Sequence, residues 1–425
     1  HRDSDRRRQT ALESRESSPI RVGIALRQIG RCRGNDPRFV IEPAIDCRRR
    51  RDANRAHHFA TLERALRLIR SEHIALGRRG RDVRLRDALS DERERDAERD
   101  HECACDRFQQ MRAMVLDDQV NVVSGRPTPT PAAGEVLVRV IRAGVCETDL
   151  QLIKGYMGFR GVLGHEFVGV AESGPLAGRR VVGEINCACW TCETCRMGLP
   201  THCPNRTVLG ILNHDGAFAD HIAVPQRNLH AVPDTLSDDV AVFTEPVAAA
   251  FQIPVQLTIR KNDRIAILGD GRLGNLCAQV LARLSDHVRV IGKHQEKLAI
   301  LRSMGIATAM LSDSFDARSF DIVVDCTGSE SGLPTALHLV RPRGTIVLKT
   351  TVAGQQTLAW APFVIDEVTL VGSRCGPFDK AIAALEQGHV QVQDLISDRF
   401  DLSRGLDALA RAQTKGILKV LLDVS

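Results

Sequence analysis

The sequence predicts an α/β protein in which a β-rich part is joined to a doubly wound parallel sheet. Short runs of alternating apolar and polar residues, such as Glu135 to Ile141, are separated by Gly and Pro turns and indicate half-buried strands. After Pro254 the pattern changes, because an apolar strand at Arg264 to Gly269 is followed by a helical segment at Leu273 to Leu284 and a second strand at His287 to Ile291. Two more apolar strands continue this alternation, at Phe320 to Cys326 and Gly344 to Lys349.

Length and composition limit the class of protein. A chain of 425 residues with 43% hydrophobic residues can bury at least two cores. No apolar run reaches the roughly 18 residues that a membrane-spanning helix needs, and no charged segment followed by an apolar one opens the chain. We therefore expect a cytoplasmic protein whose 13 cysteines are mostly reduced.

The charge distribution changes sharply at Met111. Residues 1–110 contain 27 Arg, no Lys and 20 acidic residues, a net charge of +7, whereas the remainder contains 31 basic and 33 acidic residues and carries −2. Arg runs could bind a nucleic acid, but the mixture of both signs argues against such a surface, and the many acids argue against an organelle-targeting segment. We expect a spurious or disordered extension, with the natural start at Met111 or Met114 and at most one loose helix at Ala60 to Leu76.

Four closely spaced cysteines are the most specific motif in the chain: Cys189, Cys192, Cys195 and Cys203. Four thiolates within 15 residues match the ligand set of a tetrahedral Zn²⁺ site, and a chain of this length lacks the marks of a small disulfide scaffold. Because the protein fills all four positions, the site should be structural and hold a loop in place. Cys187 falls outside this spacing and is expected to be a bystander.

A glycine-rich turn joins the strand that ends at Gly269 to the helix that follows it. The turn reads Gly-Asp-Gly-Arg-Leu-Gly, and in this context its backbone can approach a pyrophosphate at the positive N-terminus of the helix. We predict a Rossmann-type dinucleotide site, the alternative being a turn that serves only strand-to-helix packing. The predicted cofactor contacts are Gly269, Gly271, Arg272, Leu273 and Gly274 in the turn, and Thr327 and Gly328 after a later strand.

The end of the second strand indicates which dinucleotide is bound. An acid at this point usually binds the ribose 2′-hydroxyl of NAD, but the stretch from Ile291 to His294 contains none. A cationic Lys293, assisted by His294, would suit a 2′-phosphate, so we predict NADP(H) in preference to NAD(H). The alternative is that Lys293 is a solvated surface charge and that NAD is accepted.

A second constellation precedes the glycine turn. It consists of the segments Gly144 to Asp149 and Gly164 to Glu166, followed by Glu245 and Pro246. Together with the cysteine loop and the glycine turn, in this order, these residues resemble the medium-chain dehydrogenase/reductase family, in its zinc-dependent alcohol, polyol and threonine dehydrogenase branch. The resemblance covers roughly residues 112–425 and leaves residues 1–110 unmatched.

The resemblance implies a catalytic Zn²⁺ in addition to the structural one, so that each chain would hold two. Cys146 and His165 would be ligands, with either Glu245 or Glu166 as the third and a fourth place left for water or substrate. The metal would act as a Lewis acid that lowers the pKa of a bound alcohol, which then gives a hydride to the nicotinamide ring.

Residues beside these ligands have implied roles as well. Thr148 stands where family members use a hydroxyl to pass the alcohol proton outward, and Asp149 is expected to brace the backbone or a ligand histidine. Many members complete the proton relay with a histidine where this chain has Gln151, which cannot titrate. The stretch from Glu147 to Gly164, which normally contributes to the substrate pocket, is short.

The family fold also implies a domain arrangement and an assembly. Residues 111–253 and 375–425 would form a β-rich, GroES-like catalytic domain, into which residues 254–374 insert as the Rossmann domain. The returning tail should contain an amphipathic helix at Phe378 to Gln387 and a closing strand at Ile417 to Asp423. Val368 to Ser373 is expected as an edge strand that pairs across a two-fold axis, giving a homodimer or homotetramer.

The function predicted from these residues is a zinc-dependent dehydrogenase of secondary alcohols or polyols that uses NAD(P). One alternative, a zinc-free quinone or enoyl reductase of the same superfamily, would lack the residues that Cys146, His165 and Glu166 supply. Two further alternatives are a nucleic-acid-binding protein that acts through residues 1–110 and a cofactor-binding regulator without turnover. The sequence does not identify the alcohol, because substrate specificity depends on pocket shape.

Overall fold

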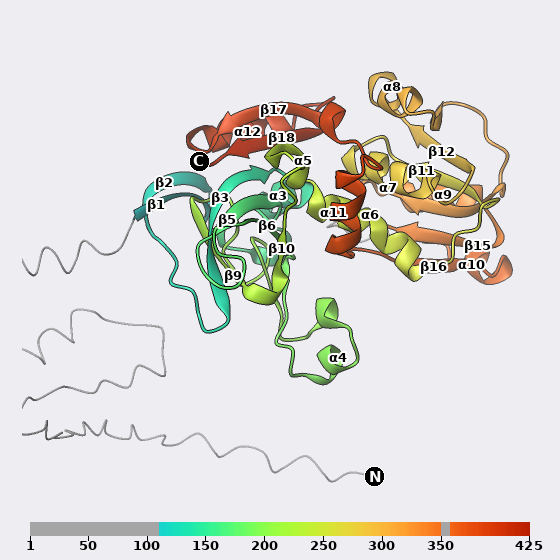
Figure 1. Ribbon diagram of the computed structural model, residues 1–425. Helices are drawn as coiled ribbons and strands as arrows, with labels where there is room; N and C mark the ends of the chain where they lie inside the picture. The colour runs from blue at the N-terminus through green and yellow to red at the C-terminus, as the bar shows by residue number, and fades with distance from the viewer. Residues whose placement is uncertain (1–109, 350–357) are drawn as a thin grey trace, which may run out of the picture. The chain divides into compact units, whose positions relative to one another are not determined.

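The computed structural model describes residues 110–349 and 358–425, which form four sheets and the helices that cover them (Figure 1). The expected N-terminal extension and the helix predicted at Ala60 to Leu76 lie outside the described residues. Within the described part of the chain, no helix is long and apolar enough to cross a membrane.

Six parallel strands form one sheet, in the order β13-β12-β11-β14-β15-β16. Their bounds are β11 (Arg264–Leu268), β12 (His287–Gly292), β13 (Ala307–Met310), β14 (Phe320–Asp325), β15 (Val340–Leu348) and β16 (Thr369–Gly372). The first three strands run outward in one direction from β11 and the last three in the other, which is the doubly wound order. Ligands of such sheets bind at the carboxyl ends of the strands where the order reverses, here between β11 and β14.

Four helices alternate with these strands in the described residues, and the first lies close to the helix predicted at Leu273 to Leu284. They are α7 (Arg272–Ala282), α8 (Gln295–Ser303), α9 (Gly332–Leu339) and α10 (Ala361–Ile365). In α7 all eight residues from Gly274 to Leu281 are buried, so the helix is covered on more than the apolar face that packs on the sheet. α6 (Thr244–Gln256) precedes the sheet and contains Pro254, where the sequence pattern changes, within its last turn.

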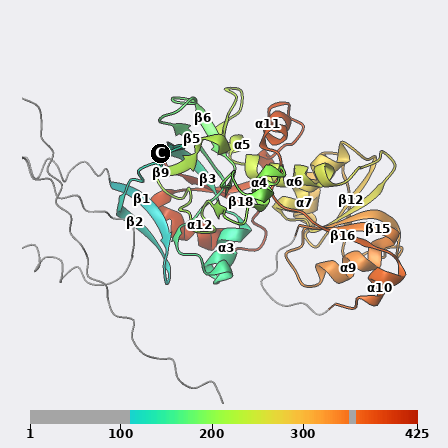
Figure 2. The same cartoon turned by 90° about the horizontal axis from the view of Figure 1, so that it is seen from below.

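A seven-stranded sheet forms the centre of the other domain, in the order β10-β6-β5-β3-β18-β17 with β9 paired to β3. Its strands are β3 (Glu135–Gly144), β5 (Phe167–Ala171), β6 (Arg180–Gly183), β9 (His221–Pro225), β10 (Leu229–Ala231), β17 (Ile396–Asp401) and β18 (Lys419–Asp423). β3 alternates between buried and more exposed residues, as its sequence predicts. The tail strand β18 pairs with β3 and therefore lies inside this sheet (Figure 2).

Smaller elements complete the second domain. The strands are β1 (Gln110–Leu116), β2 (Val120–Pro127) and β4 (Gly161–Val162) in a three-stranded sheet, and β7 (Asn186–Cys187) with β8 (Thr207–Val208) in a two-stranded one. The helices are α3 (Glu147–Ile153), α4 (Glu193–Arg196), α5 (Asp238–Ala241), α11 (Phe378–Glu386) and α12 (Gly405–Ala412). These helices come from two stretches of the chain, residues 147–241 and residues 378–412, and the strands of the parallel sheet lie between them in the sequence.

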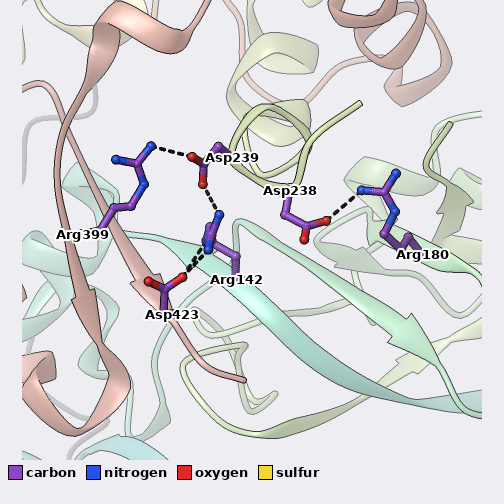
Figure 3. A network of polar contacts seen from close by, with 6 residues as sticks. All are labelled: Arg142, Arg180, Asp238, Asp239, Arg399 and Asp423. Atoms are coloured by element: carbon purple, nitrogen blue, oxygen red, sulfur yellow. Dashed lines mark hydrogen bonds and ion pairs between the residues drawn. The ribbon is translucent and has the colours of Figure 1, made fainter. Parts of the chain in front are cut away.

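Ion pairs fasten the returning tail to the start of this domain (Figure 3). Arg142 on β3 contacts Asp239 on α5 and Asp423 on β18. Arg399 on β17 reaches the other oxygen of Asp239, at 2.5 Å. One carboxylate therefore joins two arginines that lie more than 250 residues apart in the sequence.

Candidate functional site

The four predicted cysteine ligands lie together in the lobe between β7 and β8. Each of the four sulfur atoms is within 4.8 Å of the others, and Cys203 Sγ lies 3.5 Å from Cys189 Sγ and 3.7 Å from Cys192 Sγ. Ligands of a tetrahedral zinc with Zn–S bonds of about 2.3 Å stand about 3.8 Å apart. None of these four cysteines forms a disulfide. The spacing thus fits one metal ion held by four thiolates.

Local structure arranges this lobe. Cys192 caps the N-terminus of α4, so that Cys195 follows on its first turn, and Cys203 ends a short 3-10 helix. Hydrogen bonds from the Thr191 backbone and hydroxyl lower the pKa of the Cys189 thiol to about 5, whereas desolvation raises that of Cys195 to about 12. The lowered pKa favours the thiolate form of Cys189 as a metal ligand, and Cys195 would lose its proton as the metal binds.

A second cluster lies at the amino end of α3. Cys146 Sγ, a ring nitrogen of His165 and a carboxylate oxygen of Glu166 are all within 4.8 Å of one another. Asp149 Oδ2 accepts a hydrogen bond of 2.8 Å from the Cys146 backbone N–H, which fixes the start of the helix. His165 and Glu166 immediately precede β5, a buried strand that pairs with β3, and this pairing brings them opposite Cys146.

The polar atoms of this cluster are arranged as metal ligands would be. His165 Nδ1 lies 3.3 Å from Asp149 Oδ1, which leaves Nε2 to face the cluster, and both side chains are almost fully buried. The contact between Asp149 and His165 is an ion pair without hydrogen-bond geometry, so these two atoms, together with Glu166 Oε1, are the buried polar atoms of this cluster that lack a hydrogen-bond partner among the described residues. Burial would raise the pKa of the Cys146 thiol, but His165 and Arg272 lower it to about 6. A soft thiolate, an imidazole and a carboxylate at one buried point suit Zn²⁺.

The two glutamates predicted as alternative third ligands are placed differently. Glu166 belongs to the tight cluster, and its Oε2 contacts Nζ of Lys419, a fully buried lysine on β18. Glu245 lies in the first turn of α6 and is not part of that cluster. Burial raises the pKa of Glu245 to about 7. The charge of His165 lowers this pKa, and that of Cys146 raises it.

Thr148 and Gln151 both lie on α3. The Thr148 hydroxyl is 3.9 Å from Cys146 Sγ and half-buried, so it borders the cluster. Gln151 Nε2 instead donates a hydrogen bond of 2.7 Å to Glu147 Oε1 on the exposed side of the helix. The residue where relatives place a relay histidine is therefore engaged with a surface carboxylate.

The glycine turn joins β11 to α7 as predicted. Gly269 has φ +109°, and a Cβ on Gly274 would lie only 2.0 Å from the Gly269 carbonyl oxygen, so neither position accepts a side chain. A Cβ on Gly271, in contrast, would meet nothing within 4 Å. The backbone at the start of α7 is thus open on the side where a pyrophosphate would approach the helix N-terminus.

The remaining predicted cofactor residues surround this turn with one exception. Leu273 packs on the core of the domain, and Lys293 and His294 follow β12, with Lys293 exposed. Thr327 donates both its N–H and its hydroxyl to Asp325 at the end of β14, and Gly328 follows with φ +62°. The exception is the guanidinium of Arg272, which donates to the carbonyl oxygens of Val145 and Leu418 in the other domain, at 3.3 and 2.8 Å.

Two buried lysines are absent from the sequence prediction. Besides Lys419, Lys349 at the end of β15 donates to the carbonyl oxygens of Ala249 at 2.6 Å and Arg374 at 3.2 Å. Both lysines meet partners that are distant in the sequence, so no local motif announces them. Only their positions, Lys349 directly after an apolar strand and Lys419 within one, could have drawn attention to them, because a lysine is unusual there.

Known proteins share both domains and the fold of this chain. Residues 132–234 match the alcohol dehydrogenase GroES-like domain, and residues 273–387 match the zinc-binding dehydrogenase domain. A sorbitol dehydrogenase of Halalkalibacterium halodurans is 27% identical over 325 residues, which cover 71% of this chain and 94% of that protein.

Solved structures give the same result. A zinc-binding dehydrogenase of Sinorhizobium meliloti 1021 bound to NADP is 25% identical with a TM-score of 0.67, covering 74% of this chain and 100% of the other. An alcohol dehydrogenase of Escherichia coli CFT073 complexed with NADH is 26% identical with a TM-score of 0.68, covering 74% of this chain and 99% of the other.

The fold and the two matched domains define a zinc-dependent, nicotinamide-dependent oxidoreductase of the alcohol dehydrogenase class. The chain belongs to the zinc-dependent medium-chain dehydrogenase/reductase family. The predicted fold class, a GroES-like domain with a Rossmann domain, is confirmed, as are the enzyme class and the use of NAD(P).

Proposed function

We propose that this enzyme interconverts a secondary alcohol or polyol with its carbonyl compound at the cluster of Cys146, His165 and Glu166. The observation that supports this most strongly is the convergence of a thiol, an imidazole and a carboxylate within 4.8 Å, with buried polar atoms that lack partners among the described residues. Sorbitol dehydrogenase among the relatives supports the polyol as a substrate class.

Each residue of the cluster has a role in this proposal. Cys146 and His165 hold the metal, and Asp149 keeps the His165 ring oriented through its Nδ1. Thr148 accepts the proton of the substrate hydroxyl and passes it outward, which its half-buried position next to Cys146 permits. When bound, zinc would supply a Lewis acid and the nicotinamide ring a hydride acceptor.

The third ligand is proposed to be Glu166 or Glu245, in exchange. Lys419 neutralises Glu166 Oε2, and Oε1 is buried without a hydrogen-bond donor among the described residues. Glu245 stays nearby on α6, and its raised pKa indicates a carboxylate that gains from a neighbouring cation. Together with the four-cysteine lobe, the proposal requires two zinc ions per chain.

NADP(H) is proposed to be favoured over NAD(H). The strand β12 ends at Gly292 rather than at an acid, and the exposed Lys293 and the imidazole of His294 follow it.

A homodimer or homotetramer is proposed to form through β16, the edge strand of the parallel sheet. That edge is exposed together with large apolar residues of α10 and its neighbourhood: Trp360, Val364, Ile365 and Leu370. The predicted cytoplasmic location stays a prediction.

The test is zinc content per full chain, measured together with reduction of NADP⁺ and NAD⁺ by a panel of secondary alcohols and polyols. We expect two zinc ions in the parent and one in Cys146→Ala, with turnover reduced at least about a thousandfold. Cys187→Ser is the matched control and should keep both metals and activity. A Cys146→Ala variant that retains both its zinc and its turnover would refute the proposed site.

A further inference from the structure

Asp270, the residue between the first two glycines of the turn, directs its carboxylate to the end of β12. Asp270 Oδ2 accepts hydrogen bonds of 2.6 Å from the backbone N–H of Lys293 and from that of His294. Asp270 itself is only 7% exposed. A side chain from the end of β11 therefore fixes the backbone that follows the neighbouring strand.

The position of this carboxylate is made possible by Gly292. A Cβ on Gly292 would lie 2.4 Å from Asp270 Oδ2 and 2.6 Å from Asp270 Cβ. The carboxylate thus fills the space that a side chain at the end of β12 would need. In a NAD-binding Rossmann domain an acid at the end of this strand binds the ribose 2′-hydroxyl. Here the acid at this place comes from the glycine turn instead.

Hydrogen-bond donors of the protein itself engage the Asp270 carboxylate. Besides the two backbone N–H groups, His294 Nδ1 lies 3.0 Å from Oδ1 and 3.2 Å from Oδ2. Burial raises the pKa of Asp270, but the hydrogen bonds from His294 and Lys293 outweigh it and hold that pKa below its ordinary value. The carboxylate is therefore ionised and engaged by protein donors rather than open to a ribose hydroxyl.

The same contacts define the His294 ring. Because a carboxylate only accepts, Nδ1 carries the proton that is shared with Asp270, and Nε2 is left on the opposite side of the ring. The His294 side chain is 23% exposed, and no hydrogen bond to Nε2 is formed within the described part of the chain. Next to it stands Lys293, whose side chain is exposed.

We propose that Asp270 is a positioning residue for recognition of the 2′-phosphate of NADP, because it orients His294 so that Nε2 and the Lys293 ammonium meet that phosphate together. This inference rests on the proposed preference for NADP(H). The phosphate monoester would bind a point charge from Lys293 and a directed hydrogen bond from His294. In this arrangement both ring nitrogens of His294 carry a proton, and Nδ1 donates to Asp270 while Nε2 donates to the phosphate.

The test uses two probes that need no catalysis, adenosine 2′,5′-bisphosphate and 5′-AMP, with binding to the full chain measured by calorimetry. In Asp270→Asn the side-chain NH₂ group would face one of the donors that the carboxylate now accepts from, so the His294 ring loses its fixed orientation. Affinity for the bisphosphate should fall about tenfold or more, while that for 5′-AMP changes by less than about twofold. Glu296→Gln, an exposed change in the first turn of α8, is the matched control and should alter neither.

A second set of variants separates orientation from a general effect on the turn. His294→Gln should lower bisphosphate affinity to a similar extent, and adding Asp270→Asn to it should cause no further loss, because Asp270 acts through His294. Lys293→Ala should lower bisphosphate affinity independently and add to either change. His294→Gln alters a partly exposed side chain, so it keeps the proposal testable even where Asp270→Asn folds poorly.

Three outcomes would overturn the proposal. Stronger bisphosphate binding by Asp270→Asn would mean that the carboxylate repels the phosphate and selects NAD. Equal losses for both probes would mean that Asp270 only braces the turn. If the parent bound neither 5′-AMP nor the bisphosphate, the dinucleotide site of the proposed function would be refuted, together with this inference.

Discussion

Lys419 Nζ contacts the carboxylate of Glu166 inside the catalytic domain, and both side chains are fully buried. Lys419 also donates to the Val145 carbonyl oxygen at 3.2 Å, next to the predicted zinc ligand Cys146. The ion pair thus joins the last strand of the sheet to both segments that carry the predicted ligands.

Replacing one partner of this pair should be costly. In Lys419→Met the Glu166 carboxylate stays buried without its cation, and we expect the free energy of unfolding to fall by about 3–5 kcal/mol. Lys419→Met combined with Glu166→Gln should recover most of that loss. Urea denaturation at pH 7 measures both, with the exposed Lys415→Met as the control. Equal losses in the single and double variants would show that the charge pair does not determine the effect.

The four-cysteine lobe should account for one zinc ion. Cys195→Ser removes a sulfur from the tetrahedral set, so zinc content should fall by one ion per chain and the segment between β7 and β8 should become sensitive to protease. Cys187→Ser is the control, because Cys187 lies outside the set and desolvation raises the pKa of its thiol to about 12. Elemental analysis of both variants decides this, and a loss of zinc from Cys187→Ser alone would contradict the assignment.

The Asp239 network in Figure 3 predicts a pH dependence of stability. Burial raises the pKa of Asp239, but Arg399 and Arg142 lower it more, so that its folded-state pKa lies below the ordinary 3.8. A lowered folded-state pKa stabilises the protein above the unfolded value, and this contribution is lost as pH falls through the folded value. Asp239→Asn should therefore lower the free energy of unfolding by about 1–3 kcal/mol at pH 7.

The difference between parent and Asp239→Asn should shrink when denaturation is followed from pH 7 to below pH 3. Asp238→Asn provides a matched control, since Asp238 contacts a single arginine, Arg180, at 2.8 Å. Its effect at pH 7 should stay within about 1 kcal/mol. A loss for Asp239→Asn that does not vary with pH would exclude the ion pairs as its cause.

The proposed assembly through β16 can be tested at the apolar residues beside it. Val364 and Ile365 on α10 are 77% and 76% exposed, so Val364→Asp with Ile365→Asp should not disturb the monomer fold but should disrupt an interface there. Light scattering should then report a monomer. Leu406→Asp on α12, which is 49% exposed, is the control and should leave the assembly unchanged. An unchanged mass in the double variant would place the interface elsewhere.

Much of the fold could be predicted because its signals are local. The glycine turn between Gly269 and Gly274 requires adjacent residues with special backbone and packing demands, and the structure has β11 before it and α7 after it. The cysteine lobe is likewise specified by spacing over a few residues. The observed ends of strands and helices differ from the predicted ones by one to several residues, because an apolar pattern alone does not define an end. The strand predicted to begin at Gly344, for example, begins at Val340.

Other features of the site depend on contacts between distant segments and could not be predicted. Arg272 belongs to the glycine turn in the sequence, yet its guanidinium donates to carbonyl oxygens of the catalytic domain. Lys419 reads as a charged residue in an apolar strand, and its partner Glu166 lies 253 residues earlier. Asp270 occupies a variable position of the glycine motif in the sequence. Its role is visible only in the structure, where its carboxylate fills the space beside Gly292.

The place of β18 between β3 and β17 has a consequence for how the protein is made. The parallel sheet is completed by β16, which ends at Gly372, whereas the catalytic sheet lacks its inner strand until residues 419–423 have been synthesised. Domains fold as units during synthesis, so the cofactor-binding half can form on the ribosome while the other half waits. Until then residues 142–144 of β3 lack the strand that pairs with them, and Glu166 lacks the Lys419 ammonium. Residues 419–423, which are synthesised after the whole parallel sheet, thus complete the catalytic sheet and bring Lys419 to the place where the predicted metal ligands meet.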